Sequence, residues 1–280
     1  MRSVTFPDGR SGPALGQGTW YMGDSTGARA EEIAALRTGL DLGMTLVDTA
    51  EMYGDGAAEE LVGEAVAGRR DDVFLVSKVL PYKASRKGVV EACHGSLRRL
   101  QTDRLDLYLL HWPGPYPLEE TIAGFEQLRD SGDIGGWGLS NFDDGELTGL
   151  PSDYGQGSVE GPQTNQILYN LTRRGPEFDL LRSARGAGMP VMAYSPIEQG
   201  RLLGNPVLAG IAARHGTSDA QIALAWVLRQ DHIIAIPKSG SAAHVRENNA
   251  AMDISLTPQD LAELDAAFPP PRAPQPLEML

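Results

Sequence analysis

The chain has 280 residues, 41% of them apolar and 22% charged, a composition typical of a globular protein with a large hydrophobic core. The formal net charge of −13 argues against nucleic acid as a partner, because that partner requires a basic face. No apolar run reaches the ~20 residues of a membrane span, the N-terminus shows no signal peptide, and the one cysteine, Cys93, cannot form an internal disulfide. We therefore expect a cytoplasmic protein without membrane or nucleic-acid partners, and we expect it to be a monomer.

Strand-like runs alternate with amphipathic helical segments along the whole chain. Residues 4–10 come first and predict a β-hairpin that turns at Pro7-Asp8-Gly9. Several of the later runs are continuously apolar, as in strands that are covered on both faces. The predicted barrel strands are Ala14–Gly18, Thr45–Asp48, Val73–Lys78, Leu105–His111, Gly135–Ser140, Gln163–Ile167, Pro190–Tyr194 and Ile233–Pro237.

The segments between these strands have helical periodicity, as at Ile33, Leu36 and Leu40. The order of elements predicts an α/β fold in one domain over residues 1–280. It is a (β/α)8 TIM barrel with a short N-terminal β-hairpin, an extra helix between strand seven and helix seven, and a C-terminal helix and tail. A doubly wound open sheet is the alternative, but no G-x-G-x-x-G sequence follows the first strand. The Gly-rich stretch 141–161 is interpreted as a loop over one barrel mouth.

Polar residues end most of the predicted strands. In a parallel barrel the carboxyl ends of all strands surround one mouth, where active sites of this architecture lie. From strand two onward these ends carry Asp48, Lys78, His111, Ser140-Asn141, Gln166, Tyr194-Ser195 and Lys238-Ser239. Taken singly, Asp48 and Lys78 could form a buried structural ion pair, and His111 could be a core histidine. Their convergence on one mouth favours a catalytic site.

Tyr53 lies five residues after Asp48 and completes a set that is suited to carbonyl reduction. Hydride transfer to a carbonyl requires a proton donor for the nascent alkoxide, and tyrosine, with a pKa of about 10, is a weak acid near neutrality. We expect the Lys78 ammonium to lower the pKa of Tyr53, and Asp48 to keep Lys78 charged. His111 would hydrogen-bond the substrate oxygen. The sequence offers no cluster of His and Cys with ligand spacing, so no metal is expected.

Short motifs contain these residues and follow one another in a specific order. They are Gly16-Gln17-Gly18-Thr19, Val47-Asp48-Thr49-Ala50-Glu51-Met52-Tyr53-Gly54, Val76-Ser77-Lys78, Leu107-Tyr108-Leu109-Leu110-His111-Trp112, Gly138-Leu139-Ser140-Asn141-Phe142, Thr164-Asn165-Gln166, Ala193-Tyr194-Ser195-Pro196 and Ile236-Pro237-Lys238-Ser239. Over nearly its whole length the sequence resembles the aldo-keto reductase family, and within it the bacterial methylglyoxal-reductase-type members. The resemblance places that family's catalytic tetrad on Asp48, Tyr53, Lys78 and His111.

The resemblance also implies NADPH as the cofactor. Ser140, Asn141 and Gln166 would bind the nicotinamide carboxamide while Tyr194 stacks on the ring. The other implied contacts are Gly18, Thr19 and Asp48, with Ser195, Pro196 and Ile197 beside the pyrophosphate, Lys238, Ser239 and His244 near the 2′-phosphate, and Glu247 and Asn248 at the adenine. The family commonly has arginine where this chain has His244. Because histidine is only partly charged near neutrality, we expect a weaker preference for NADPH over NADH.

The implied substrate is a small molecule with a carbonyl group. Trp20, Met52 and Trp112 adjoin tetrad or cofactor residues and are expected as apolar walls of a pocket that also contains Tyr53 and His111. The loop after strand four is short and contains three prolines, and the C-terminal tail is also short. Both features favour an open site for small aldehydes and dicarbonyls such as methylglyoxal.

Two other functions remain open for such a barrel. A Schiff-base aldolase could use Lys78, although that function would not explain Gln166 or the pair Lys238-Ser239. A nucleotide-binding redox sensor with little turnover is the second alternative, and the intact set of four catalytic residue types argues against it.

Overall fold

The computed structural model describes residues 2–280 and begins with the expected hairpin. Strands β1 (Ser3–Thr5) and β2 (Ser11–Pro13) pair antiparallel. Gly9, in the turn between them, has a φ of 87°, a left-handed conformation that favours glycine. Phe6 is buried and stacks on Phe74 with 5.0 Å between ring centroids. Because Phe74 begins a barrel strand, the hairpin covers the amino end of the barrel.

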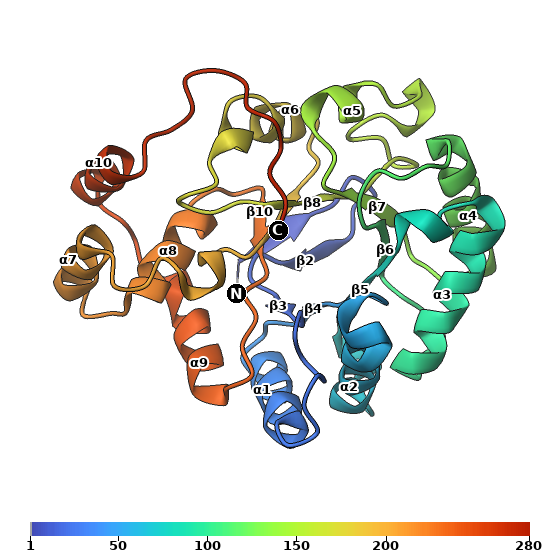
Figure 1. Cartoon of the computed structure of the whole chain (residues 1–280), viewed down its shortest axis with the longest axis horizontal. Coiled ribbons are helices and arrows are strands. Elements are labelled where there is room, and N and C mark those ends of the chain that lie inside the picture. Colours follow the sequence, from blue (N-terminus) through green and yellow to red (C-terminus); the bar gives the residue numbers. More distant parts are fainter. Residues whose placement is uncertain (1) are drawn as a thin grey trace.

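Eight parallel strands form the barrel (Figure 1). They are β3 (Gln17–Gly18), β4 (Leu46–Asp48), β5 (Phe74–Val79), β6 (Leu107–Leu110), β7 (Trp137–Ser140), β8 (Asn165–Leu168), β9 (Val191–Tyr194) and β10 (Ile233–Ala235). Each strand pairs with its neighbour in chain order. Parallel bridges from Leu15 to Ala235 and from Gly18 to Lys238 join the first strand to the last and close the sheet. The predicted barrel is confirmed, with most strands shorter than predicted.

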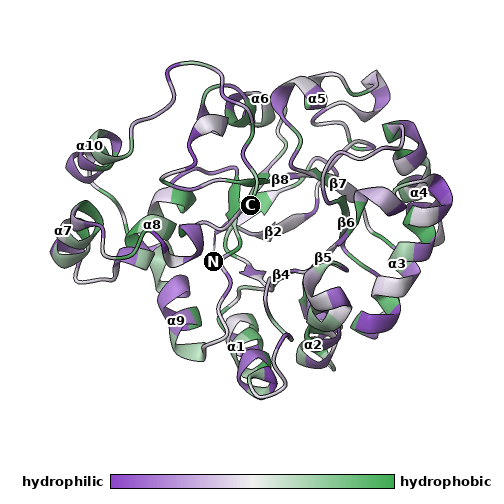
Figure 2. Ribbon diagram, viewed as in Figure 1, coloured by the Kyte–Doolittle hydropathy of each residue, from purple (hydrophilic) through white to green (hydrophobic). Residues whose placement is uncertain are grey.

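Helices surround this barrel (Figure 1). They are α1 (Arg29–Asp41), α2 (Ala57–Val66), α3 (Arg86–Leu100), α4 (Leu118–Ser131), α5 (Asp144–Thr148), α6 (Leu180–Gly186), α7 (Pro206–His215), α8 (Asp219–Leu228), α9 (Ala242–Ala250) and α10 (Pro258–Ala267). Figure 2 shows that the helices around the barrel mix hydrophobic and hydrophilic residues. Within residues 2–280, no helix combines the length and the hydropathy needed to cross a membrane.

Two helices are additions to the repeating strand–helix unit, as predicted. Helix α7 lies between β9 and α8, and α10 follows α9 near the end of the chain. The two additions are joined by ion pairs, because the buried Asp260 carboxylate accepts from Arg214 Nη2 at 2.7 Å and contacts His215 Nε2 at 2.9 Å. The segment after α10, drawn in red in Figure 1, returns across the barrel and ends over its middle.

Residues 141–161 are mostly irregular, as predicted, but they include a short helix and do not all lie over one mouth. Asp143 and Glu146 form a capping box that starts the short helix α5, despite the surrounding glycines. Farther along, Trp137 Nε1 donates to the carbonyl of Glu160 at 3.2 Å. Because Trp137 begins β7, the segment has by then reached the amino end of the barrel. It is therefore the crossover from β7 to β8, and only its first residues lie at the mouth.

Candidate active site

The carboxyl ends of β4 and β5 bring three polar side chains together. Asp48 is the last residue of β4, Lys78 lies one residue before the end of β5, and Tyr53 begins the short 3-10 helix Tyr53–Gly56. Lys78 Nζ donates to Asp48 Oδ2 at 2.9 Å and to Tyr53 OH at 3.1 Å. It donates a third hydrogen bond, at 2.8 Å, to the carbonyl of Thr49. The three ammonium hydrogens therefore all have partners, which fixes the position of this charge.

The charges of Lys78 and Asp48 are both buried. Lys78 has no exposed side-chain surface and Asp48 only 3%. Burial works against the charged form of Lys78, but the Asp48 carboxylate and the Tyr53 oxygen outweigh it and raise the pKa of Lys78. Gln166 Nε2 donates to the second carboxylate oxygen, Asp48 Oδ1, at 2.7 Å. This contact with Gln166 was not foreseen from the sequence, where that residue was assigned only to the cofactor.

Tyr53 is a weaker acid in this structure than the sequence suggested. Burial raises the pKa of Tyr53 above its ordinary value of about 10, and the Lys78 ammonium counteracts only part of this effect. The expectation of a lowered pKa is therefore wrong, because loss of hydration around the phenolate outweighs the neighbouring charge. Tyr53 remains protonated near neutrality and can donate its proton, with Lys78 stabilising the phenolate that results.

His111 follows β6 and lies beside Tyr53, with 5.8 Å between the ring centroids. Burial, assisted by the nearby Lys78 charge, lowers the pKa of His111 from 6.5 to about 2. The imidazole is therefore neutral near neutral pH. Its buried Nδ1 atom has no hydrogen-bond partner among the described residues. A neutral imidazole of this kind can hydrogen-bond a substrate oxygen without acting as the acid.

A cavity of about 640 Å³ opens at this mouth of the barrel. Most of the residues that were predicted for cofactor and substrate binding line it. They are Gly18, Thr19, Trp20, Asp48, Met52, Tyr53, His111, Trp112, Ser140, Asn141, Gln166, Tyr194, Ser195, Pro196, Ile197 and Lys238. The predicted residues Ser239, His244, Glu247 and Asn248 do not line it. They lie just before α9 or on it.

Three side chains along the cavity wall are connected by hydrogen bonds. Tyr194 OH donates to Asn141 Oδ1 at 3.0 Å. Asn141 Nδ2 in turn donates to the carbonyl of His111 at 3.0 Å and to Ser140 Oγ at 3.1 Å. Asn141 has a left-handed φ of 61°, which asparagine tolerates better than most residues with a side chain. The connections link the expected nicotinamide-binding residues to the backbone of the tetrad histidine.

Lys238 places an exposed cation on the cavity wall. Lys238 is exposed and makes no ion pair with the described residues. It is followed by Ser239, whose Oγ accepts from Ser241 N at 3.2 Å just before α9 begins. His244 and Glu247 are exposed on α9, and Asn248 is buried. A free ammonium beside a helix N-terminus is suited to bind a phosphate.

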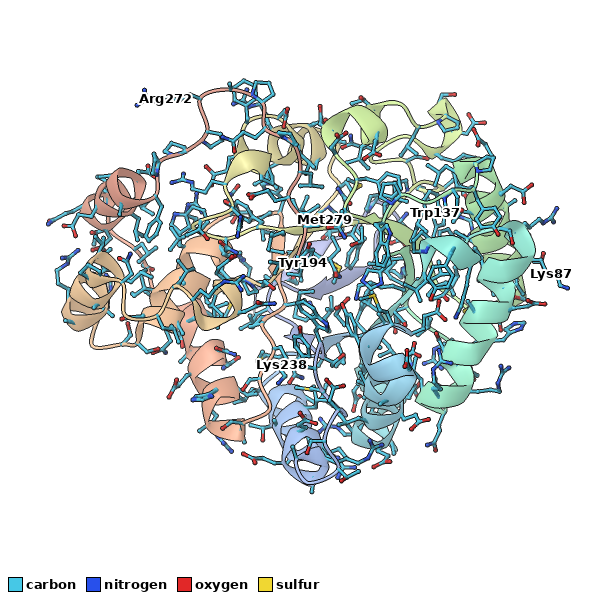
Figure 3. All side chains as sticks on the ribbon, in the orientation of Figure 1. Lys87, Trp137, Tyr194, Lys238, Arg272 and Met279 are labelled. Carbon is cyan, nitrogen blue, oxygen red and sulfur yellow. The ribbon has the colours of Figure 1, made fainter. Side chains whose placement is uncertain are left out.

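The cavity also has walls that the sequence did not indicate. They are Tyr21, Gln199, Gly200, Ile236, Pro237, Met279 and Leu280. The last two belong to the C-terminal tail, and Figure 3 shows Met279 near Tyr194 over the middle of the barrel. The sequence did not indicate that this short tail would reach the site. Although short, the tail crosses the barrel and contributes to the cavity.

Comparison with known proteins agrees with this geometry. A family model described as the aldo/keto reductase family matches residues 14–268. The methylglyoxal reductase YeaE of Escherichia coli is 48% identical, covering 100% of this chain and 99% of that protein. An aldo-keto reductase of Mycolicibacterium smegmatis is 35% identical over 93% of this chain and 91% of its own length.

The fold is shared with solved structures as well. The crystal structure of an aldo-keto reductase from Klebsiella pneumoniae in complex with NADPH superposes with a TM-score of 0.95 and 46% identity, covering 100% of this chain and 99% of that one. The family match spans far more than half of the chain. It includes every strand of the barrel, and it includes Asp48, Tyr53, Lys78 and His111. This chain belongs to the aldo/keto reductase family.

Proposed function

We propose that this protein reduces the carbonyl group of an aldehyde or ketone to an alcohol by hydride transfer from NADPH. The observation that carries the proposal is the position of Lys78 Nζ, which contacts Asp48 Oδ2 at 2.9 Å and Tyr53 OH at 3.1 Å at the edge of the cavity. The relative from Klebsiella pneumoniae was crystallised with NADPH, and the relative from Escherichia coli is named a methylglyoxal reductase.

The residues of the cavity fit a nicotinamide cofactor. No hydrogen bond from another described residue reaches Gln166 Oε1. This oxygen is therefore available to a carboxamide, with Ser140 and Asn141 beside it. Tyr194 presents an aromatic ring for stacking, and Lys238 offers an unpaired cation at the phosphate end. NADPH bound in this way supplies the hydride.

The chain's own residues provide the proton and hold the substrate. We propose that Tyr53 donates its proton to the carbonyl oxygen as negative charge develops there. Lys78 stabilises the phenolate that forms, and Asp48 keeps Lys78 charged and in place. His111, neutral and lying beside Tyr53, hydrogen-bonds the same oxygen and orients the carbonyl.

The walls on the substrate side favour a neutral carbonyl compound. Trp20, Met52 and Trp112 are apolar or aromatic, and the tail adds Met279 and Leu280. Among the described residues that line the cavity, Lys238 is the only side-chain cation that could pair with a substrate carboxylate. We propose small aldehydes and dicarbonyls, including methylglyoxal, as substrates.

The proposal is tested by assaying a panel of neutral and carboxylate-bearing carbonyl compounds with NADPH and with NADH, following cofactor oxidation. We expect turnover of the neutral compounds and faster turnover with NADPH. A protein that binds NADPH but turns over no compound would instead be a redox sensor. Borohydride trapping tests the aldolase alternative, which the raised pKa of Lys78 disfavours because a Schiff base requires the neutral amine.

We also propose that residues 1–280 form one domain that acts as a monomer in the cytoplasm. The closed barrel and its covering helices form one continuous buried core, which supports a single unfolding transition. Light scattering coupled to size-exclusion chromatography checks the oligomeric state, and calorimetry checks for one transition.

A further inference from the structure

The loop that follows β9 has an unusual backbone. Ser195, Glu198 and Gln199 have left-handed φ angles of 48°, 50° and 55°, which are unfavourable for residues that carry a Cβ. Ser195 and Gln199 line the cavity, on the side where the pyrophosphate of the cofactor is expected. A backbone of this kind persists only where its surroundings hold it in place.

The group that holds this loop is the carboxylate of Glu198. It points away from the cavity and is only 4% exposed. It accepts hydrogen bonds from Asn170 Nδ2 at 2.7 Å, and from Arg173 Nη2 and Arg201 Nη2 at 2.9 Å each. Asn170 Nδ2 also donates to the carbonyl of Ser195 at 2.9 Å. Asn170, which follows β8, therefore holds the loop at two points, and Arg173 contributes a cation.

Arg173 has a second partner on the opposite side. Its Nη1 donates to Glu278 Oε1 in the C-terminal tail. The next two residues, Met279 and Leu280, line the cavity. One guanidinium therefore contacts both the loop after β9 and the tail.

The neighbouring arginine holds the beginning of the same tail. Arg174 Nη1 donates to Asp265 Oδ1 at 2.7 Å and to the carbonyl of Phe268, where α10 ends. Between these two attachment points the tail makes few polar contacts, and it includes the exposed Arg272, which Figure 3 places at the periphery of the molecule. The dipeptide Arg173-Arg174 thus fastens both ends of the tail segment.

We propose that Arg173 is a positioning residue that couples the two sides of the cavity. Through Glu198 it holds the loop that faces the cofactor, and through Glu278 it holds the tail that faces the substrate. The assignment of one side of the cavity to the cofactor and the other to the substrate rests on the proposed function. It follows that loss of Arg173 disturbs both cofactor binding and the tail. Loss of Arg201 disturbs only cofactor binding, and loss of the Glu278 carboxylate disturbs only the tail.

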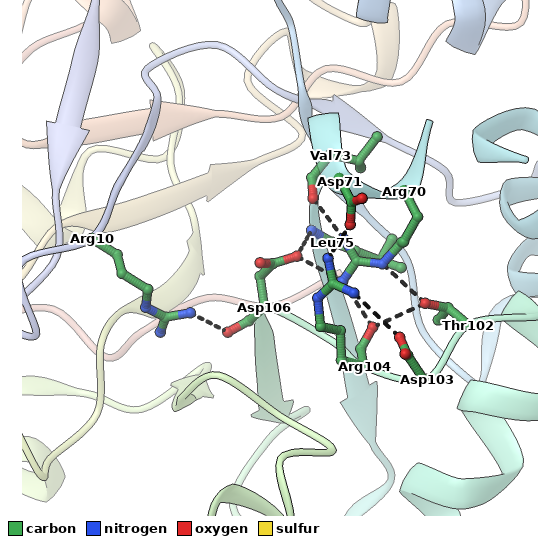
Figure 4. Close-up of polar contacts among 9 residues, drawn as sticks. All are labelled: Arg10, Arg70, Asp71, Val73, Leu75, Thr102, Asp103, Arg104 and Asp106. Carbon is green, nitrogen blue, oxygen red and sulfur yellow. Dashed lines mark hydrogen bonds and ion pairs between the residues drawn. The ribbon is translucent and has the colours of Figure 1, made fainter. Parts of the chain in front are cut away.

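Three variants separate these effects. Arg201→Met removes a cation from Glu198 without touching the tail, Glu278→Gln releases only the tail, and Arg173→Met removes both contacts. Arg104→Met is the control, because Arg104 pairs with Asp71 at 2.6 Å within the network of Figure 4, which lies at the amino ends of β5 and β6 and far from the site. Thermal melting checks that each variant is folded.

Two measurements, one of cofactor binding and one of tail cleavage, need no turnover. The first is the Kd of NADPH by fluorescence titration. The second is the rate at which trypsin cleaves after Arg272, followed by mass spectrometry of the released segment 273–280. We expect Arg201→Met to weaken NADPH binding only and Glu278→Gln to speed cleavage only. Arg173→Met should do both by about 5-fold or more, the lower end of ordinary coupling between sites, while Arg104→Met should match the parent.

Steady-state kinetics adds a readout that general destabilisation does not reproduce. We expect Arg173→Met to raise the carbonyl KM by about 5-fold or more with little change in kcat, because β5 holds Lys78 and the 3-10 helix after β4 holds Tyr53 independently of the tail. A folded Arg173→Met protein with the parent's Kd for NADPH, or with the parent's cleavage rate, overturns the proposal. If the parent turns over no carbonyl compound, the proposed function fails. The Kd of NADPH and the rate of cleavage after Arg272 still decide the role of Arg173.

Discussion

Gln166 and Asp48 are 118 residues apart in the chain, and their side chains meet at 2.7 Å between Nε2 and Oδ1. The other oxygen of the same carboxylate accepts from Lys78. Both oxygens of a buried acid are thereby engaged, one by an amide and one by a cation. This arrangement fixes the orientation of Asp48, and through Lys78 it fixes the charge next to Tyr53.

The first prediction separates the structural role of Lys78 from its chemical role. Lys78→Met should leave Asp48 charged, buried and held only by Gln166, which costs about 3–5 kcal/mol of unfolding free energy. It should also remove most of the activity, because burial and the Asp48 charge then raise the pKa of Tyr53 without the opposing effect of Lys78. Chemical denaturation and NADPH-dependent reduction measure the two effects.

The double variant Lys78→Met/Asp48→Asn is the matched control. It removes the unpaired charge while keeping an oxygen that accepts from Gln166, so stability should recover in large part while activity stays low. If activity recovered together with stability, the role of Lys78 would be purely structural.

The second prediction concerns the proton donor. Tyr53→Phe removes only the hydroxyl that lies 3.1 Å from Lys78 Nζ. We expect the protein to bind NADPH with the parent's affinity and to lose about 10²–10⁴-fold in kcat, the usual contribution of a positioned acid. Fluorescence titration and steady-state kinetics give the two values. Turnover near the parent's rate would assign the proton to another group.

The third prediction follows from the lowered pKa of His111. Its folded-state pKa is about 2, and an unfolded histidine titrates near 6.5. Between these values the unfolded state binds the extra proton, so stability falls as the pH drops below about 6.5. At pH 5 the contribution of this residue is a loss of about 2 kcal/mol, at about 1.4 kcal/mol per pH unit.

Urea unfolding of the parent and of His111→Gln at pH 7 and pH 5 measures this loss. The parent should lose more stability than the variant between the two pH values. An equal loss in both proteins would mean that His111 takes up a proton in the folded state, and it would then be a competing candidate for the acid.

The fourth prediction concerns the choice of cofactor. Lys238 makes no ion pair with the described residues, and His244 is exposed in the first turn of α9. His244→Arg introduces a permanent, forked cation and should tighten NADPH binding while leaving NADH almost unchanged. Parallel titrations with both cofactors test this. Equal tightening of both would place residue 244 away from the 2′-phosphate.

The barrel and the convergence of the strand ends could be predicted because both depend on local patterns. Apolar runs of strand length alternate with helical periodicity, and in a parallel barrel each strand's carboxyl end reaches the same mouth. Asp48, Lys78 and His111 could therefore be placed together before any contact was known. Helix caps also follow from short-range hydrogen bonding, as in the capping box of Ser218 and Gln221 at the start of α8.

The remaining features depend on groups that are distant in the chain. The contact between Gln166 and Asp48, the position of Met279 in the cavity wall and the two partners of Arg173 join segments whose spacing in the sequence carries no periodic signal. The sequence predicted a lowered pKa for Tyr53, and the structure raises it, for a related reason. The effect of a neighbouring charge can be anticipated from residue types, but the loss of hydration that opposes it depends on how completely the folded chain excludes water. The sequence by itself determined the architecture and the identity of the reacting groups. The tertiary structure alone decided their acidity, their support and the contribution of the tail to the cavity wall, because burial is a property of the whole packed chain.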